Sequence, residues 1–364
     1  MSVNEPPSPA HDDEVRRFVK QAGWGEQFSC IPLGGGANNR VWKLVPASTD
    51  QQPLVLKQFF RGPAGSRDRC SAEWTFASHA HHAAAGRVPA PRGYHAKQGL
   101  ALYDFIDGEK PRPEFVSRSH LDEMLQFYRL LNTEVAGRQL SAVIGPASET
   151  WDTPAGHVAC VDRRLRNLAC LDPSLPHGGQ AKAFLEQALQ PVWRQVKLAY
   201  FDCLDDLGLE LNEPLSGDVR RLSPSDFGLH NTIETAMADG DRRLVFFDFE
   251  HAGWDDPAKM VCDMFCQPAI PLDQAWFTDA VRAVTADLPE PDRHAAFARG
   301  LLPIYRIKWC CILLNEFLPE GLTRRRFADQ QAAAAERLAG QLEKAAAMLG
   351  RLEPKAQAIS PTTP

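Results

Sequence analysis

Hydrophobic and polar residues alternate along much of the first hundred positions, a pattern that is typical of β-strands. In "PLVLKQFF", residues 53–60, the alternation places Val55, Lys57 and Phe59 on one face of a strand. The segment "IPLGGGANNRVWKLV", residues 31–45, predicts two strands joined by a glycine-rich turn. Residues 89–110, "PAPRGYHAKQGLALYDFIDGEK", predict two further strands and a closing loop. We therefore expect a small β-rich region before residue 108.

A single helix is predicted within this β-rich region, over residues 67–82. Its apolar residues recur at helical spacing and form one stripe, which consists of Ala72, Phe76 and Ala80. Glu73 lies beside the stripe. The rest of the region is predicted to be strands and turns.

Beyond residue 108 the apolar residues recur mostly at helical spacing, except in a β-like island over residues 231–250. Helices are predicted over residues 120–134, 181–207, 272–286, 293–317 and 330–349. The expected fold class is therefore α+β, with a β-rich N-lobe and a larger, mainly helical C-lobe. We assign residues 13–107 to the N-lobe and 108–350 to the C-lobe, and we predict that the ends, 1–12 and 351–364, are disordered.

Composition narrows the function classes. The chain has 364 residues, which favours two lobes over one core, and a net charge of -6, which argues against a nucleic-acid partner. The nine cysteines contain no C-x-x-C pair, so reduced thiols in a cytoplasmic protein are expected. No secretory signal and no run long enough to span a bilayer is visible, so no membrane partner is predicted. The oligomeric state is not readable from the sequence.

Three polar residues in the second half of the chain have spacings that suit phosphoryl transfer. Asp226 and Asn231 lie in "SDFGLHN" with four residues between them, and Asp248 follows the apolar run 244–247. Mg²⁺ prefers oxygen ligands, and the amide of Asn231 and the carboxylate of Asp248 are of that type. Asp226 can accept a hydrogen bond from a hydroxyl group and orient it for attack.

The β-rich region carries the residues that such a reaction needs around a nucleotide. The three glycines of the turn, Gly34, Gly35 and Gly36, allow backbone N–H groups to approach phosphates closely. Lys57 can contact the α- and β-phosphates, and Glu73 on the following helix can pair with it. Each of these features is common by itself, and it is their order along the chain that favours a nucleotide site.

With these motifs the sequence resembles the small-molecule kinases of the aminoglycoside phosphotransferase and choline kinase type, which are distant relatives of protein kinases. The resemblance covers roughly residues 28–320, and "VFFDFEHAGWDDPAKMVCDMF" is its closest segment. It implies a protein-kinase-like fold. It also implies that Asp226 is catalytic and that Asn231 and Asp248 bind the metal, with Glu250 completing a D-x-E motif.

The resemblance extends to the N-lobe. "PLGGGANNRVWKL" is similar to the family's nucleotide loop, which adds Asn38 to the glycines as a nucleotide-binding residue. "LVLK" is similar to its lysine strand, and "AEWTF" to its glutamate helix. "LYDFIDGE" is similar to its hinge, where backbone groups from Asp104 to Ile106 would bind adenine.

One position departs from the family pattern. The family usually carries a histidine two residues before the catalytic aspartate, where it braces the loop, and this chain has Pro224 there. His230 could brace the loop instead, and an ordinary surface role for His230 is equally open.

We therefore predict an ATP- or GTP-dependent, Mg²⁺-requiring phosphotransferase that acts on a hydroxyl group of a small molecule. Amino sugars, other sugars, choline-like alcohols and amino-acid alcohols all fit as acceptors. The alternative is a catalytically silent relative that serves as a nucleotide-binding sensor or scaffold. Pro224, in place of the usual histidine, is the observation that favours it.

Overall fold

The computed structural model describes most of the chain, and the described residues belong to two compact units. Those residues are 9, 12–25, 27–34, 39–61, 67–133, 143–236, 240, 242–318 and 334–352. The first unit takes in 1–151, 216–295 and 327–329, and the second takes in 152–215, 296–326 and 330–364. The lobe boundary at 107/108 stays a prediction. The predicted disordered ends, 1–12 and 351–364, lie almost wholly outside the described residues.

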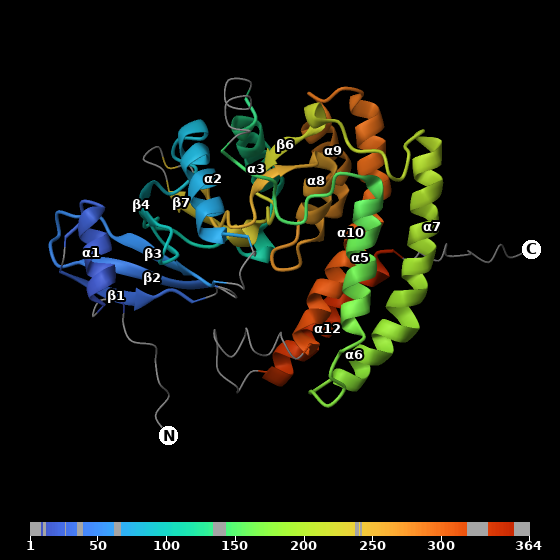
Figure 1. Ribbon diagram of the computed structural model, residues 1–364, viewed down its shortest axis with the longest axis horizontal. Helices are drawn as coiled ribbons and strands as arrows, with labels where there is room; N and C mark the ends of the chain where they lie inside the picture. Colours follow the sequence, from blue (N-terminus) through green and yellow to red (C-terminus); the bar gives the residue numbers. More distant parts are fainter. Residues whose placement is uncertain are drawn as a thin grey trace, which may run out of the picture. The chain divides into compact units, whose positions relative to one another are not determined.

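The first unit contains an antiparallel sheet of five strands in the order β1-β2-β3-β5-β4 (Figure 1, blue to cyan). The strands are β1 (Phe28–Pro32), β2 (Asn39–Pro46), β3 (Leu54–Phe59), β4 (Pro91–His95) and β5 (Leu100–Asp104). They confirm the strands predicted from the alternating pattern. In β3 the buried Leu54 and Leu56 point to one face, so Val55 and Lys57 point to the other.

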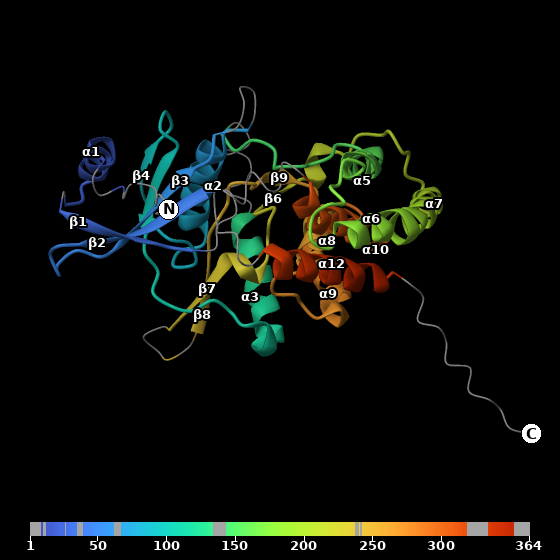
Figure 2. The same ribbon diagram turned by 90° about the horizontal axis from the view of Figure 1, so that it is seen from below.

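Helix α1 (Asp13–Gln21) covers the first of these faces (Figure 2). It begins at Asp12, whose carboxylate accepts a hydrogen bond from the Glu14 N–H at 2.8 Å. Three apolar residues, Val15, Phe18 and Val19, pack against the sheet. The expectation of a single helix in this region was wrong. The apolar stripe of α1 is only three residues long, and a helix of nine residues depends on the surface that it covers.

Helix α2 (Arg69–Ala83) covers the opposite face of the sheet. Along β5, Leu100 and Leu102 point towards α1, so Tyr103 points the other way and its ring lies 6.3 Å from that of Trp74 on α2. Glu73 on the same helix is buried and faces β3. The helix predicted over 67–82 is therefore present, as one of two helices in this region.

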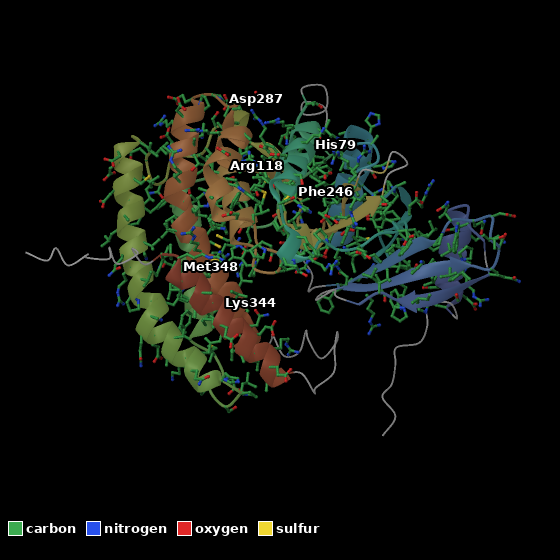
Figure 3. The ribbon with its side chains drawn as sticks, turned by 180° about the vertical axis from the view of Figure 1, so that it is seen from behind. His79, Arg118, Phe246, Asp287, Lys344 and Met348 are labelled. Atoms are coloured by element: carbon green, nitrogen blue, oxygen red, sulfur yellow. The ribbon has the colours of Figure 1, made fainter. Side chains whose placement is uncertain are left out.

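The rest of the first unit is built from helices and two short hairpins. The helices are α3 (Arg118–Leu131), α8 (Pro257–Cys266) and α9 (Phe277–Thr285), with short turns η2 (Pro113–Phe115), η4 (Gly217–Val219), η5 (Leu229–Asn231) and η6 (Gln274–Trp276). Strand β6 (Arg221–Ser223) pairs with β9 (Gly253–Asp255), and β7 (Thr232–Ala236) pairs with β8 (Arg242–Phe246). Phe246 lies in the interior, where its ring stacks on Phe127 of α3 at 4.2 Å (Figure 3). This stacking fixes the β7–β8 hairpin against α3.

The second unit is helical. Its elements are α5 (Pro154–Leu168), α6 (Gly178–Phe184), a π-helical turn η3 (Leu185–Leu189), α7 (Gln190–Asp206), α10 (Pro291–Leu314, which starts in the first unit), η7 (Asn315–Phe317) and α12 (Ala334–Gly350). Asp162 of α5 accepts hydrogen bonds from Trp193 and Lys197 of α7. His157 of α5 hydrogen-bonds the Tyr305 hydroxyl of α10 at 2.9 Å. Within the ranges that the structure describes, no helix is long and apolar enough to cross a bilayer.

Candidate functional site

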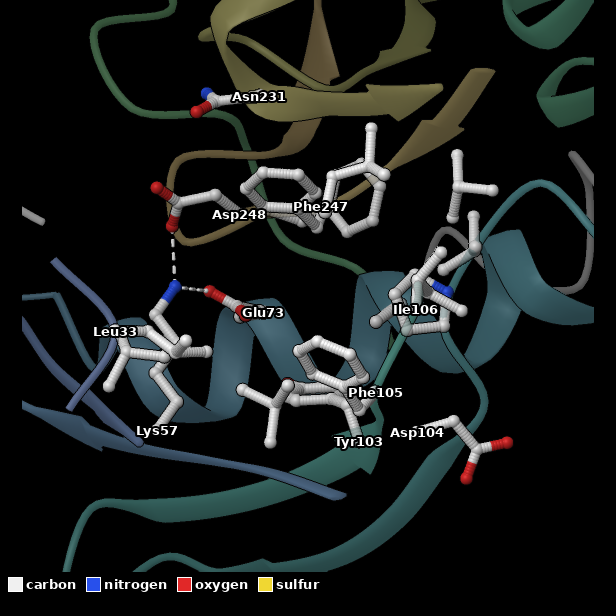
Figure 4. A pocket seen from close by; sticks show the side chains of 18 of the residues that line it. Leu33, Lys57, Glu73, Tyr103, Asp104, Phe105, Ile106, Asn231, Phe247 and Asp248 are labelled. Atoms are coloured by element: carbon white, nitrogen blue, oxygen red, sulfur yellow. Dashed lines mark hydrogen bonds and ion pairs between the residues drawn. The ribbon is translucent and has the colours of Figure 1, made fainter. Parts of the chain in front are cut away.

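A cavity of about 390 Å³ lies within the first unit and is lined by both the five-stranded sheet and the β7–β8 hairpin (Figure 4). Aliphatic and aromatic side chains form most of its wall. They include Leu33, Val41, Val55, Ala77, Val88, Phe105, Ile106, Ile233, Val245 and Phe247. An apolar slot of this kind can hold a flat aromatic base, and the few polar groups at its end then decide what chemistry follows.

Lys57 stands at the polar end of the cavity. Strand β3 directs it away from the α1 face, and its ammonium lies 2.5 Å from the Glu73 carboxylate and 2.5 Å from the Asp248 carboxylate (Figure 4). Its exposed fraction is 6%. The pairing of Lys57 with Glu73 that the sequence predicted is therefore present, and Asp248 is a second partner.

Burial and charge act in opposite directions on this cluster. Burial acts to lower the pKa of Lys57, but the carboxylates of Asp248 and Glu73 outweigh it, so the pKa is raised and the lysine is charged. Burial raises the pKa of Glu73 to about 7, even though Lys57 pulls it down. A permanently charged ammonium at the end of an apolar slot is suited to bind phosphate oxygens.

The hinge residues line the cavity, and their contacts show which groups a ligand can reach. The Asp104 carboxylate accepts two hydrogen bonds from Arg92, at 2.5 and 2.7 Å, and points away from Lys57 (Figure 4). The Phe105 N–H donates to the Pro53 carbonyl at 3.1 Å. The Ile106 N–H has no acceptor among the residues that the structure describes. Of these side chains and N–H groups, the Ile106 N–H is therefore the donor available to a base.

The segment after the hinge is attached to strand β7. Glu109 and Glu234 exchange two backbone hydrogen bonds, at 3.1 and 2.8 Å. A Cβ atom on Gly108 would lie 2.3 Å from the Glu234 carbonyl oxygen, so only glycine permits this approach. Lys110, which sequence reasoning missed, lines the cavity and donates to the His230 carbonyl at 3.3 Å. The sequence held no signal for it beyond its place after the hinge.

Asp226 lies in the loop between β6 and η5. Ser225, just before it, has a φ of 67°, a backbone conformation that residues other than glycine rarely adopt. The Asp226 carboxylate accepts hydrogen bonds from His230 at 3.2 Å and from the Asn231 amide nitrogen at 3.3 Å. Burial acts to raise the pKa of Asp226, but the hydrogen bond and the electrostatic interaction with His230 outweigh it, so the pKa is lowered. Asp226 is therefore a carboxylate at neutral pH.

Asn231 connects Asp226 to the cavity. Its amide nitrogen also donates to the Asp226 carbonyl at 3.0 Å, so its amide oxygen is directed elsewhere. Its own carbonyl accepts from the Phe247 N–H at 3.1 Å, which brings Asn231 next to Asp248, and both side chains line the cavity. Asp226 itself is not part of the cavity wall and reaches it only through Asn231.

The residues present fit a hard divalent cation. No group of three His, Cys, Asp or Glu side chains that could hold a metal occurs in the described part of the chain. One carboxylate and one amide oxygen are nevertheless the usual protein share of a Mg²⁺ site in which nucleotide phosphates and water supply the other ligands. Asn231 can supply the amide oxygen and Asp248 the carboxylate. The backbone of Asp248, like that of Ser225, has a φ of 67°.

Glu250, the second acid of the D-x-E segment, is occupied by protein contacts. It is 4% exposed and accepts a hydrogen bond from Asn39 at 2.7 Å, and it also pairs with Arg69 at 3.4 Å and His251 at 3.3 Å. Asn39 is a second residue that sequence reasoning missed. It begins β2, and its contact connects the end of the glycine-rich turn to the segment that carries Asp248.

The glycine-rich turn is only partly described. Gly34 lines the cavity, as expected of a residue that approaches a phosphate. The predictions for Gly35, Gly36 and Asn38 lie outside the described residues. Six other predicted residues line this cavity, and Asp226 is the predicted residue outside its wall. The six are Lys57, Glu73, Asp104, Ile106, Asn231 and Asp248.

Comparison with known proteins identifies a family for most of the chain. The sequence profile of the phosphotransferase enzyme family matches residues 29–297, which include the cavity and the loop of Asp226. Among curated proteins, no sequence matches the chain.

Several solved structures have a similar fold at low sequence identity. An ethanolamine kinase from Plasmodium vivax is 10% identical, with a TM-score of 0.55, 92% of this chain covered and 89% of that one. A choline kinase from Streptococcus pneumoniae is 12% identical, with a TM-score of 0.52 and 93% and 99% covered. An aminoglycoside 2'-phosphotransferase in complex with GDP is 14% identical, with a TM-score of 0.56 and 94% and 99% covered. These similarities show a protein-kinase-like fold, as the sequence predicted.

Proposed function

The chain belongs to the phosphotransferase enzyme family, and from this premise we propose that it transfers the γ-phosphate of ATP or GTP to a hydroxyl group of a small molecule. The observation that carries the proposal is the grouping of Lys57, Glu73, Asn231 and Asp248 at one end of an apolar cavity. Charge-stabilising groups lie at the end of a slot that suits a nucleobase, which is the arrangement that phosphoryl transfer requires.

Each residue has a defined part in the proposed reaction. The base occupies the apolar slot and accepts a hydrogen bond from the Ile106 N–H. Lys57, held by Glu73, binds phosphate oxygens. Asn231 and Asp248 hold Mg²⁺, which neutralises phosphate charge when it is bound. The protein supplies positioning and electrostatic stabilisation, which account for most of the catalysis in this class of reaction.

Asp226 acts on the acceptor. Its carboxylate accepts a hydrogen bond from the acceptor hydroxyl and orients the oxygen towards the γ-phosphorus. A bond forms between that oxygen and the phosphorus, and the bond from the phosphorus to the bridging oxygen of the diphosphate breaks. The hydroxyl proton passes to Asp226 and then to solvent, so the products are a phosphate monoester and a nucleoside diphosphate.

The acceptor classes that fit are amino sugars, other sugars, choline-like alcohols and amino-acid alcohols. The similar structures carry the names of ethanolamine, choline and aminoglycoside kinases, which supports a panel that contains these three acceptor types. We propose to incubate the protein with Mg²⁺, ATP or GTP and each acceptor. Nucleoside diphosphate release and the mass of the phosphorylated product are the measurements.

Asp226→Asn is the matched test of the mechanism. We expect kcat to fall about 10²- to 10⁴-fold, the usual contribution of a general base, while nucleotide binding measured by calorimetry is retained. Asp218→Asn, at an exposed aspartate of η4, is the control and should leave kcat unchanged. Nucleotide binding without phosphorylation of any acceptor would instead support the sensor or scaffold. Full activity of Asp226→Asn would refute the role of Asp226.

A further inference from the structure

The Asp226 carboxylate is held by side chains from two separate segments of the chain. His230 contacts its Oδ2 atom at 3.2 Å, and Gln267, which follows helix α8, donates to its Oδ1 atom at 3.3 Å. Asn231 contacts Oδ2 as well, at 3.3 Å. Pro224 stands where a bracing histidine would be expected, and a proline has no donor to offer. His230 and Gln267 thus supply donors to the carboxylate where Pro224 has none.

A count of acceptor sites shows that this arrangement leaves room for a substrate. An ionised carboxylate offers about four lone-pair sites to donors. Contacts within the protein use two sites on Oδ2, for His230 and Asn231, and one on Oδ1, for Gln267. One site on Oδ1 is left, which is what a single acceptor hydroxyl needs.

The orientation of Gln267 is determined by its neighbours. Its amide oxygen accepts a hydrogen bond from the Ala269 N–H at 3.0 Å, so its amide nitrogen is the atom that faces Asp226. The side chain is 7% exposed, which limits other rotamers. Gln267 is therefore a preset donor, placed by the end of α8.

The orientation of His230 follows from the chemistry of its partner. The Nε2 atom of His230 lies 3.2 Å from Asp226 Oδ2 and 3.3 Å from the Gln267 amide nitrogen. A carboxylate only accepts, so Nε2 must carry a hydrogen to bind Asp226, and the Gln267 amide then donates to Asp226 Oδ1 and not to His230. Its Nδ1 atom is buried and has no partner among the described residues. A buried N–H without an acceptor is more unfavourable than a bare lone pair, so the neutral ring carries its proton on Nε2.

Gly228 makes this packing possible. A Cβ atom at this position would lie 2.6 Å from His230 Nδ1 and 2.8 Å from Gln267 Cγ. Its φ of -148° is open to any residue, so glycine is needed here for space and not for its backbone freedom. One missing side chain thus lets His230 and Gln267 approach Asp226 together.

We propose that His230 and Gln267 are positioning residues that hold the Asp226 carboxylate in the orientation that receives the acceptor hydroxyl. This inference rests on the proposed function. The two side chains take the place of the brace that Pro224 cannot provide. They act through Asp226 and do not touch the nucleotide, so their loss should lower kcat and leave the KM for nucleotide unchanged.

The variants of His230 separate a positioning role from a merely structural one. The Nε2 atom of a glutamine lies the same number of bonds from Cβ as the Nε2 atom of histidine, whereas the amide nitrogen of an asparagine corresponds to Nδ1. We therefore expect His230→Ala and His230→Asn to lower kcat about 10- to 100-fold, the loss of one hydrogen bond to a charged group. His230→Gln should recover most of it. His82→Ala, at an exposed histidine of α2, is the control.

Gly228→Ala tests the packing without removing either donor. The added methyl group must displace His230 or Gln267, so we expect a similar fall in kcat. Gly217→Ala is the matched control, because a Cβ atom there meets nothing within 4 Å. Histidine-labelled nitrogen NMR gives a readout apart from turnover, and it should show the His230 ring protonated on Nε2 in the wild type.

The outcomes distinguish this inference from the proposed function. If wild-type turnover depends on Asp226 but kcat is unchanged in His230→Ala and Gly228→Ala, this inference is overturned and the proposed function stands. A His230 ring protonated on Nδ1, or a parallel rise in the nucleotide KM of these variants, also overturns it. Absence of wild-type turnover on every acceptor overturns both proposals.

Discussion

Replacing Lys259 by methionine tests how strongly a buried ion pair supports the loop of Asp226. Lys259 lies on α8, and its ammonium is 2.6 Å from the Asp255 carboxylate and 3.5 Å from that of Asp263. The side chains of Lys259 and Asp255 are 1% and 0% exposed. Asp255 belongs to β9, whose partner β6 leads directly into Asp226. The ion pair therefore ties the start of α8 to the strand that carries the loop.

The expected loss of stability can be estimated from this geometry. Removing one partner of a buried pair leaves an uncompensated charge, which costs about 3–5 kcal/mol. Burial raises the pKa of Asp255 even with Lys259 present, and without the lysine this pKa must rise further. A carboxyl group whose pKa is higher in the folded than in the unfolded state lowers the free energy of unfolding as the pH rises above its unfolded pKa. The penalty of Lys259→Met should therefore grow between pH 5 and pH 8, by at most about 1.4 kcal/mol per pH unit for each carboxyl.

Urea unfolding at the two pH values measures the total loss, and hydrogen exchange of residues 253–267 locates it. Lys97→Met, at an exposed lysine of the same unit, is the control and should change stability by less than about 0.5 kcal/mol. Adding Asp255→Asn to Lys259→Met should restore part of the stability, because it removes a buried charge that has lost its partner. A loss below about 1 kcal/mol at pH 8, or a loss equal at both pH values, would refute this reasoning.

Two further substitutions test the nucleotide site. Lys57→Met should lower kcat/KM for nucleotide about 10²- to 10³-fold in steady-state kinetics, because it removes a charged donor from the polar end of the cavity; an unchanged value would exclude contact with the phosphates. Gly108→Ala places a methyl group against the Glu234 carbonyl and should break the two hydrogen bonds that attach Glu109 to β7. Calorimetry should then show weaker nucleotide binding, by about tenfold, whereas Gly179→Ala, where a Cβ atom meets nothing within 4 Å, should bind normally.

Much of the site could be predicted because its signals are local. Alternation along β3 is a property of six consecutive residues, and it was enough to place Lys57 on the same face as Val55. Only the structure shows that this face points away from α1. The helical stripe beside Glu73 and the apolar run before Asp248 are equally local. The order of these segments along the chain also carried the family resemblance, which the match over residues 29–297 confirms.

Contacts between distant segments were decided only by the tertiary structure. Asn39 and Glu250 lie 211 positions apart, and Asp226 and Gln267 lie 41 apart, so no periodic pattern relates the members of either pair. The three-residue strands β6 and β9 are too short to show a period, and α1 is stabilised by the sheet that it covers. A sequence reveals which residue types are available at local spacing, but burial and hydrogen bonding depend on which segments the folded chain brings within a few ångströms of one another.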